Sequence, residues 1–373
     1  MEPVTIGILG CGKQAEKHIS GYAHCENVRL VLSDIDTERA RDLAGRLDLA
    51  WVETSDDIFA NREINAVDIC SVTASHMPLI SQAIEADKHF FVEKPLCQRA
   101  EDAARICEQT RAAGLIGRVG YVYRHVPMFR DAKRILGDAS TDSSNALGRL
   151  MFAFMRIGGR GSHALWKHRR ESDGGAVSEM LVHMLDLALW YFGPIGSIEV
   201  LDCGLLQPVR SIDGVMHECD APDFVAVKAV SATGVRILIQ ADMVTPAFTQ
   251  FMEIQGSKGS LVCSIDNNWP NYIFCKEAAG GMAAGRNELD IGRANFYVSQ
   301  MTEFVGHIRG GKSSGDAPPD TTLDTSVELH RLLEAINEDV GLRFADAPDA
   351  APLSGYGSLS SVPTNGQAKS ERM

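Results

Sequence analysis

The sequence predicts an α/β fold in two parts, an N-terminal doubly wound parallel sheet and a C-terminal α+β domain with a large, open, mainly antiparallel sheet. Strand and helix signals alternate to about residue 122, whereas from residue 149 short apolar strands follow one another through tight turns. Parallel strands need long crossovers and antiparallel strands need only turns, so the two parts carry different sheets. We expect domains at 1–122 and 123–344, and a disordered tail at 345–373 that is rich in Pro, Ser, Gly and Ala.

Each part is built from short apolar runs that predict strands. In the first part the strands are expected at Val4–Gly10, Val28–Ser33, Ala66–Val72, His89–Val92 and Ile116–Val122. In the second part they are expected at Arg149–Ile157, Ile198–Cys203, Phe224–Val230, Arg236–Ala241, Phe251–Gln255 and Ser260–Ile265. Helical spacing at Tyr297–Ile308 and Asp324–Asp339 predicts two helices that complete the second domain.

A glycine-rich turn, G-x-G-x-x-A from Gly10 to Ala15, directly follows the first strand and opens a helix. This is the Rossmann dinucleotide fingerprint in its required setting, with a pyrophosphate at the helix N-terminus. The second strand ends at Asp34, where an acid binds the adenosine ribose and repels a 2′-phosphate. NAD is therefore expected, with NADP left possible because Arg39 is near. The expected ligands from this segment are Gly10, Cys11, Gly12, Lys13, Gln14 and Asp34.

The run Met180–Leu189 is apolar except at His183 and Asp186, and on a regular helix both share one stripe with Glu179 and Trp190. Because buried ionisable groups are costly unless paired, the stripe indicates either a site or a core histidine with a structural acid. Asp186 is equally consistent with binding substrate and with anchoring the helix.

A second candidate is Glu93-Lys94-Pro95, which follows an apolar strand. The carboxyl end of a parallel strand faces the crevice where a nicotinamide lies. An ammonium there can hydrogen-bond a substrate hydroxyl and favour the developing alkoxide. Taken alone, this tripeptide is equally consistent with a solvated lysine at a strand end.

Several motifs together carry a resemblance to a known family. They are Gly10–Ala15, Glu93-Lys94-Pro95, Gly174–Asp186, His76 before the second motif, Gly120–Arg124 and Ile254–Ser260. In these the chain resembles the Gfo/Idh/MocA oxidoreductases, which include glucose-fructose oxidoreductase and inositol dehydrogenase, over nearly its whole length to about residue 340. Two positions depart from the family pattern, Glu179 in place of Asp and Ser71-Val72-Thr73 in place of T-P-N.

The resemblance implies a dehydrogenase or reductase that moves hydride between NAD(P) and a sugar, polyol or sugar derivative, and a C-terminal sheet that self-associates into a homodimer or homotetramer. The expected catalytic residues are Lys94, Glu179 and His183, with His183 as the base because its intrinsic pKa lies near neutrality. Further cofactor contacts are expected from Ser71, Val72, His76, Glu93 and Lys94. Substrate contacts are expected from Lys94, Tyr123, Arg124, Trp166, Glu179 and His183.

A basic, aromatic segment precedes the apolar helix. It contains Arg156, Arg160, His163, Trp166, Lys167, His168, Arg169 and Arg170. It is consistent with selection of an anionic sugar, or with a solvated loop or subunit contact. Trp166 is equally suited to stack on a sugar and to seal the domain interface.

Composition narrows the class of protein. The net charge of −13 disfavours nucleic acid and anionic membranes as partners, and no apolar span approaches membrane length. The nine cysteines lack C-x-x-C pairs, so we expect reduced thiols, no structural metal and a cytoplasmic enzyme. Two alternatives remain at this point, a non-catalytic NAD-binding regulator of the same fold, and an oxidoreductase that keeps its nucleotide and passes hydride between two sugars.

Overall fold

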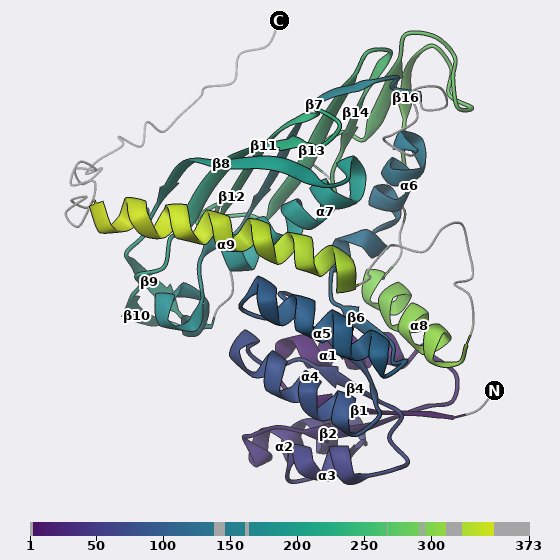
Figure 1. The fold of residues 1–373 in the computed structure, drawn as a ribbon, viewed down its shortest axis with the longest axis vertical. Helices are drawn as coiled ribbons and strands as arrows, with labels where there is room; N and C mark the ends of the chain where they lie inside the picture. The colour runs from purple at the N-terminus through teal and green to yellow at the C-terminus, as the bar shows by residue number, and fades with distance from the viewer. Residues whose placement is uncertain are drawn as a thin grey trace, which may run out of the picture.

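The computed structural model describes residues 3–137, 146–160, 164–266, 268–290, 292, 295–310 and 323–346. Its first part is a parallel sheet with strand order β3-β2-β1-β4-β5-β6 (Figure 1). The strands are β1 (Val4–Leu9), β2 (Val28–Ser33), β3 (Ala50–Trp51), β4 (Ala66–Ile69), β5 (His89–Val92) and β6 (Gly117–Val119). The crossover helices are α1 (Lys13–Tyr22), α2 (Thr37–Leu47), α3 (Ser55–Ala60), α4 (His76–Glu85) and α5 (Ala100–Ala112).

The doubly wound parallel sheet is confirmed, and its strands are apolar because both faces are covered. Every residue of β4 is buried, as are the last three of β5. Helix starts follow local chemistry: Asp36 caps α2, and Thr54 forms a capping box with Asp57 at α3. The strand β3 was missed because its two residues carry no periodicity.

The second part is an eight-stranded sheet of order β16-β15-β14-β13-β7-β12-β11-β8. Its strands are β7 (Leu150–Gly158), β8 (Ile195–Gly204), β11 (Phe224–Ser231), β12 (Arg236–Asp242), β13 (Thr249–Gly256), β14 (Gly259–Cys263), β15 (Tyr272–Cys275) and β16 (Gly285–Glu288). The pairing is antiparallel except between β7 and β12, which run parallel. A separate hairpin joins β9 (Val209–Ile212) to β10 (Val215–Glu218). The mainly antiparallel sheet is confirmed, while β9, β10, β15 and β16 were not predicted.

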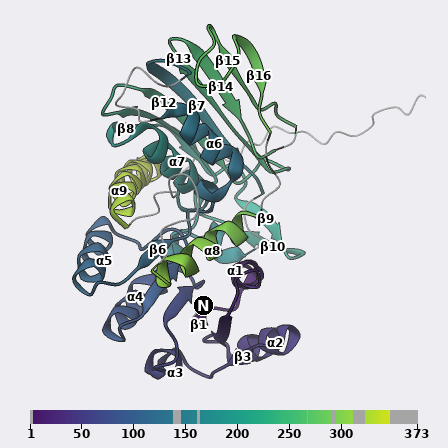
Figure 2. The ribbon, with the colours of Figure 1, turned by 90° about the vertical axis from the view of Figure 1, so that its right-hand side faces the viewer.

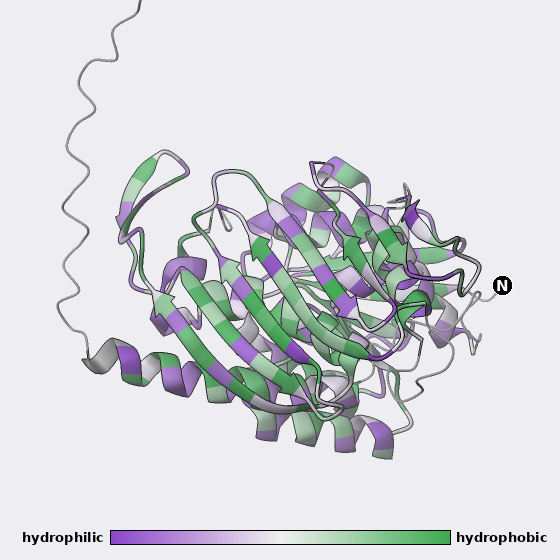
Figure 3. Cartoon of the chain, turned by 90° about the horizontal axis from the view of Figure 1, so that it is seen from above, coloured by the Kyte–Doolittle hydropathy of each residue, from purple (hydrophilic) through white to green (hydrophobic). Residues whose placement is uncertain are grey.

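One face of this sheet is covered by helices, and none of the described helices covers the other, open face. Figure 2 shows α7 (Val182–Phe192) and α9 (Leu323–Asp346) on the side that faces the parallel sheet, and α6 (Pro127–Leu136) packs against β14. Figure 3, which looks onto the opposite face, shows hydrophobic and hydrophilic residues intermixed along these strands. Phe152, Leu238 and Phe274 are each more than 40% exposed there. Such a broad apolar surface is typical of an association interface.

The helix α8 (Phe296–Ile308) belongs to the first domain, so the prediction that it completes the second was wrong. It lies against α1 and the parallel sheet: the rings of Phe304 and Phe91 are 5.6 Å apart, and Met301 is fully buried. Gly21 of α1 lets the helices approach, since an added Cβ would lie 2.8 Å from Tyr297 O. Helical periodicity identified the apolar face but not its partner.

Helix α9 contacts both α5 of the first domain and β8 of the second. It extends to Asp346, two residues into the predicted tail, and the remainder of that prediction, 347–373, lies outside the described residues. Within the described part of the chain, no helix combines the length and apolar character needed to cross a bilayer.

Candidate active site

Two elements from different domains bring the candidate catalytic groups together. The chain just after β5 supplies Glu93 and Lys94, α7 supplies His183, and the segment leading into α7 supplies Glu179. That segment, Val177–Leu181, is a π-helical turn. The prediction of a regular helix from Glu179 onward was therefore wrong in its first turn, because a π turn holds more residues and rotates Glu179 relative to the stripe.

The Lys94 ammonium points at the start of the site helix. Its Nζ lies 3.3 Å from Ser178 O, 3.4 Å from Glu179 O and 3.5 Å from Glu179 Oε2, and the side chain is only 10% exposed. Burial lowers the pKa of Lys94, against the opposing charge of Glu179, and the nearby charge of Lys167 lowers it further. Lys94 is thus a buried hydrogen-bond donor held between the two domains.

A second ammonium, that of Lys167, reaches the same carboxylate and was not among the predicted site residues. Its Nζ donates to Glu179 Oε2, and Trp166 lies beside it, with 5.0 Å between Nζ and the ring centroid. Burial raises the pKa of Glu179, but the charges of Lys94 and Lys167 outweigh this and leave it lowered. Its place in the basic segment was the only sequence signal for Lys167.

His183 faces this cluster as a neutral ring. Burial first, and the charge of Lys94 second, lower the pKa of His183 to about 3. Tyr123 packs edge-on against it, with 4.8 Å between ring centroids. The imidazole makes no hydrogen bond to another described residue, and the Glu179 carboxylate pairs with the two lysines instead. The imidazole keeps a lone pair that can accept a proton, although burial and the Lys94 ammonium make it a weaker base than a free histidine.

Arg124 and Asp186 lie behind the site in the core, which corrects the predicted substrate contact of Arg124. The guanidinium and carboxylate are 0% and 1% exposed, and the two side chains share three hydrogen bonds of 2.6–3.1 Å. The Trp190 ring lies beside the Arg124 guanidinium, with 5.7 Å between its centroid and Cζ. The open alternatives for Asp186 resolve in favour of anchoring α7, because its carboxylate is occupied by Arg124.

The glycine-rich turn forms a cradle that fits a dinucleotide. Gly10 has φ +97°, and an added Cβ would lie 3.0 Å from the Cys70–Ser71 backbone, whereas a Cβ at Gly12 would meet nothing within 4 Å. Space is therefore open in front of the α1 N-terminus, where backbone N–H groups lack intrahelical partners. The exposed Lys13 begins the helix, while Gln14 turns inward and donates to Glu93 Oε1 at 2.9 Å.

Asp34 lies at the end of β2 next to this cradle. Its carboxylate accepts from Cys11 N at 2.7 Å and from Asp36 N at 2.8 Å, and Arg39 Nη1 lies 3.8 Å away. Two acids and one arginine therefore meet where the adenosine ribose is expected. Burial, and then the charge of Asp34, raise the pKa of Cys11 to about 12, so its thiol stays protonated.

The loops after β4 and β5 are joined by His76. Its Nδ1 donates to Pro95 O at 2.8 Å, and its Nε2 lies 3.2 Å from Ser71 O. Burial lowers the pKa of His76, so the ring is neutral and its single proton serves the shorter contact. Val72 is 46% exposed at the end of β4. His76 thus shapes the wall in which Ser71 and Val72 lie.

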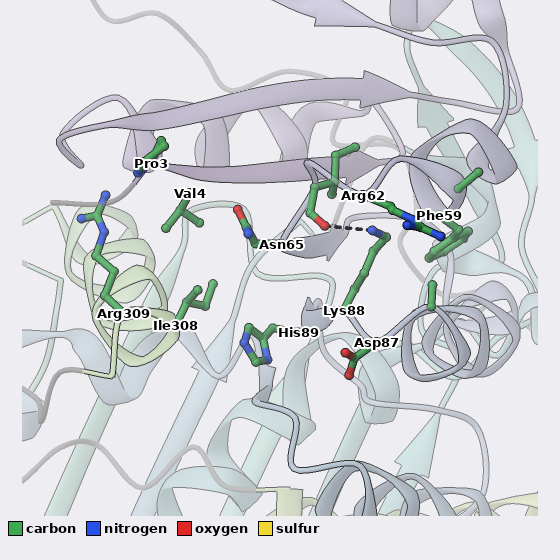
Figure 4. A pocket seen from close by; sticks show the side chains of 13 residues that line it. Pro3, Val4, Phe59, Arg62, Asn65, Asp87, Lys88, His89, Ile308 and Arg309 are labelled. Carbon is green, nitrogen blue, oxygen red and sulfur yellow. Dashed lines mark hydrogen bonds between the residues drawn. The ribbon is translucent and has the colours of Figure 1, made fainter.

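An open cavity lies at the other end of the parallel sheet (Figure 4). Asn65, Lys88 and His89 line it at the amino ends of β4 and β5, and Lys88 Nζ donates to the Asn61 and Ile64 carbonyls. Ligands of doubly wound sheets bind at the carboxyl ends of the strands. This cavity is therefore separate from the candidate site.

Comparison with known proteins agrees with the fold. Residues 4–121 match the model described as "Oxidoreductase family, NAD-binding Rossmann fold", and residues 129–262 match the "GFO/IDH/MocA C-terminal domain". An inositol 2-dehydrogenase of Acidothermus cellulolyticus is 29% identical over 341 residues, which cover 88% of this chain and 92% of that protein.

Solved structures show the same fold at lower identity. An oxidoreductase domain protein from Kribbella flavida has a TM-score of 0.80 and 20% identity, covering 92% of this chain and 98% of that one. A levoglucosan dehydrogenase in complex with NADH and L-sorbose has a TM-score of 0.78 and 18% identity, with the same coverages. The class of protein is thus an NAD-binding oxidoreductase with a Rossmann domain. The chain belongs to the Gfo/Idh/MocA family.

Proposed function

We propose that the protein is an NAD(H)-dependent dehydrogenase or reductase that moves hydride between the nicotinamide and a secondary alcohol or ketone of a sugar, polyol or sugar derivative. The observation that carries this proposal is the meeting of Lys94, Glu179 and a neutral His183 at the carboxyl end of β5. These groups supply a donor for the reacting oxygen and a base for its proton in one buried place.

A dinucleotide held by the turn Gly10–Ala15 would supply the nicotinamide as hydride acceptor for alcohol oxidation. The Lys94 ammonium donates a hydrogen bond to the substrate oxygen and favours its alkoxide character. The His183 imidazole takes the hydroxyl proton, and in the reverse direction it returns that proton to the carbonyl oxygen. Glu179 holds Lys94 and Lys167 in place through its carboxylate. Tyr123 and Trp166 form the apolar walls beside His183 and Lys167.

For the cofactor we propose NAD in preference to NADP. The Asp34 and Asp36 carboxylates flank the expected ribose position, and a 2′-phosphate there would meet two like charges. Arg39 offsets part of this repulsion, since it lies 3.8 Å from Asp34 and 3.2 Å from Asp36.

One screen tests the reaction and its alternatives together. Purified protein is mixed with NAD⁺ and a panel of polyols, aldoses, uronates and nucleotide sugars, and NADH formation is followed by absorbance. Reduction by at least one class of sugar or polyol is expected. A protein that binds NAD⁺ but reduces it with none is the regulator instead, and a purified protein that already absorbs as NADH and exchanges it between two sugars is the enzyme with retained nucleotide.

We further propose a cytoplasmic homodimer or homotetramer that associates through the open face of the eight-stranded sheet. The support is the exposure of Phe152, Leu238 and Phe274 on that face. Light scattering coupled to gel filtration measures the assembly, and a monomeric mass would overturn this part of the proposal.

A further inference from the structure

A buried ion network lies directly behind Glu93 and takes no part in the chemistry described above. His18 of α1 is fully buried between two carboxylates: its Nδ1 is 2.9 Å from Asp68 Oδ2, and its Nε2 is 3.0 Å from Glu93 Oε1. Asp68 is fully buried on β4, and the Glu93 side chain is 12% exposed. The network thus connects the dinucleotide-binding helix, the centre of the sheet and the Glu93-Lys94 segment.

The geometry favours a doubly protonated His18. A neutral imidazole has one N–H, so one of its nitrogens would direct a lone pair at a carboxylate oxygen. Burial lowers the pKa of His18, but Asp68 more than offsets this and the pKa lies well above its usual value. The Cys70 thiol also lies 3.3 Å from Nδ1. The ligand atoms of His18, Asp68 and Cys70 lie close enough together for a metal site. Both His18 ring nitrogens already contact carboxylate oxygens, however, so we interpret the group as an ion network.

His18 fixes the Glu93 carboxylate. Glu93 Oε1 accepts from His18 and from Gln14 Nε2 at 2.9 Å, and Oε2 accepts from the backbone N–H of Lys94 at 3.2 Å. Gly120 packs so closely that an added Cβ would lie 2.8 Å from Oε1. Burial raises the pKa of Glu93, but hydrogen bonding and charge from His18 bring it to about 2, so it stays anionic.

We propose that His18 is a positioning residue that locks Glu93 as a fixed anion at the nicotinamide end of the cofactor site and thereby favours NAD⁺ over NADH. This rests on the proposed binding of the nicotinamide beside Lys94. A fixed anion stabilises the cationic ring of NAD⁺ relative to the neutral ring of NADH. His18 itself acts only through Glu93, because its ring is enclosed by Asp68, Glu93 and Phe91, whose ring centroid is 5.4 Å away.

The test measures binding of NAD⁺ and NADH separately, without substrate, in the wild type, His18→Gln, Glu93→Gln and the double variant. We expect His18→Gln to weaken NAD⁺ binding about tenfold, or about 1.4 kcal/mol, and NADH binding less. If His18 acted only through its positive charge, its removal would instead tighten NAD⁺ binding. Weaker binding in His18→Gln therefore indicates positioning of Glu93, and tighter binding indicates a simple charge effect. The double variant should be no weaker than Glu93→Gln, because the two residues act as one unit.

A matched control is His89→Gln, at the opposite end of the same strand, which should leave both dissociation constants unchanged. A direct readout on the wild type is ¹⁵N-histidine NMR, where the resonance lost in His18→Gln should show two protonated ring nitrogens. A singly protonated or metal-bound His18, additive effects in the double variant, or tighter NAD⁺ binding in His18→Gln would each overturn the proposal. Since none of these readouts needs turnover, absence of dehydrogenase activity would refute the proposed function alone.

Discussion

Replacement of Arg124 by methionine should be among the most damaging single changes outside the reacting groups. Its guanidinium is fully buried and makes three hydrogen bonds to Asp186, which is 1% exposed. Arg124→Met removes these hydrogen bonds and the opposite charge from the buried Asp186 carboxylate, and removal of one partner of a buried ion pair costs about 3–5 kcal/mol. Arg124→Met should therefore lower the free energy of unfolding by that amount. It should also lower kcat, because Asp186 lies one turn after His183.

Urea unfolding measured by circular dichroism gives the free energy, and initial rates give kcat. The control is Arg111→Met, which breaks an exposed pair with Asp324 whose side chains are 69% and 70% exposed and should cost about 0–1 kcal/mol. The double variant Arg124→Met/Asp186→Leu removes both charges and should recover most of the lost stability. If Arg124→Met cost no more than Arg111→Met, the buried pair would not anchor α7 and this reasoning would fail.

Four other predictions follow from the site and the sheet. His183→Asn should lower kcat about 10²- to 10⁴-fold while NAD⁺ affinity by calorimetry stays within about twofold, and an unchanged kcat would remove His183 from the mechanism. Burial and then the charge of Lys94 lower the pKa of His183 to about 3. As the pH falls, His183 is therefore protonated in the unfolded chain at a higher pH than in the folded protein. Stability should therefore fall as the pH drops from about 6.5 towards 3, and less steeply in His183→Asn; parallel unfolding curves against pH would contradict this. Asp34→Ser should shift the ratio of kcat/KM for NADP⁺ over NAD⁺ upward by about tenfold in steady-state kinetics, and no shift would show that this acid does not read the ribose. Phe152→Asp should reduce the molar mass in light scattering to that of a monomer, since a charge on the open sheet face opposes its burial, and an unchanged oligomer would place the interface elsewhere.

The sequence predicted the elements whose signal is local. The turn Gly10–Ala15 and the segment Glu93–Pro95 could be identified because each motif follows an apolar strand, and the structure contains both strands. The positions of α8 and Lys167 could not be predicted in this way. Periodicity shows which face of a helix is apolar but not which domain covers it, and no spacing rule connects Lys167 to Glu179.

The pair His18 and Asp68 had a signal that was missed. His18 lies on the apolar face of α1 with the buried Ala15 and Ile19, and Asp68 interrupts the apolar strand β4. A polar residue at a position where the pattern requires an apolar one must be paired, and two such positions predict a contact. Arg124 was predicted to contact substrate because of the family resemblance. The sequence also contained Asp186, a carboxylate with which its guanidinium could pair in the core.

The return of α8 to the nucleotide-binding domain limits how the protein can be divided and how it can move. A fragment ending near residue 122 would lack Met301 and Phe304 and expose the surface of α1 and Phe91 to water. Such a fragment should aggregate unless residues 296–308 are supplied. In the intact protein the polypeptide passes more than once from one domain to the other. Any relative motion of the two domains is therefore restrained by several connecting segments in place of a single hinge.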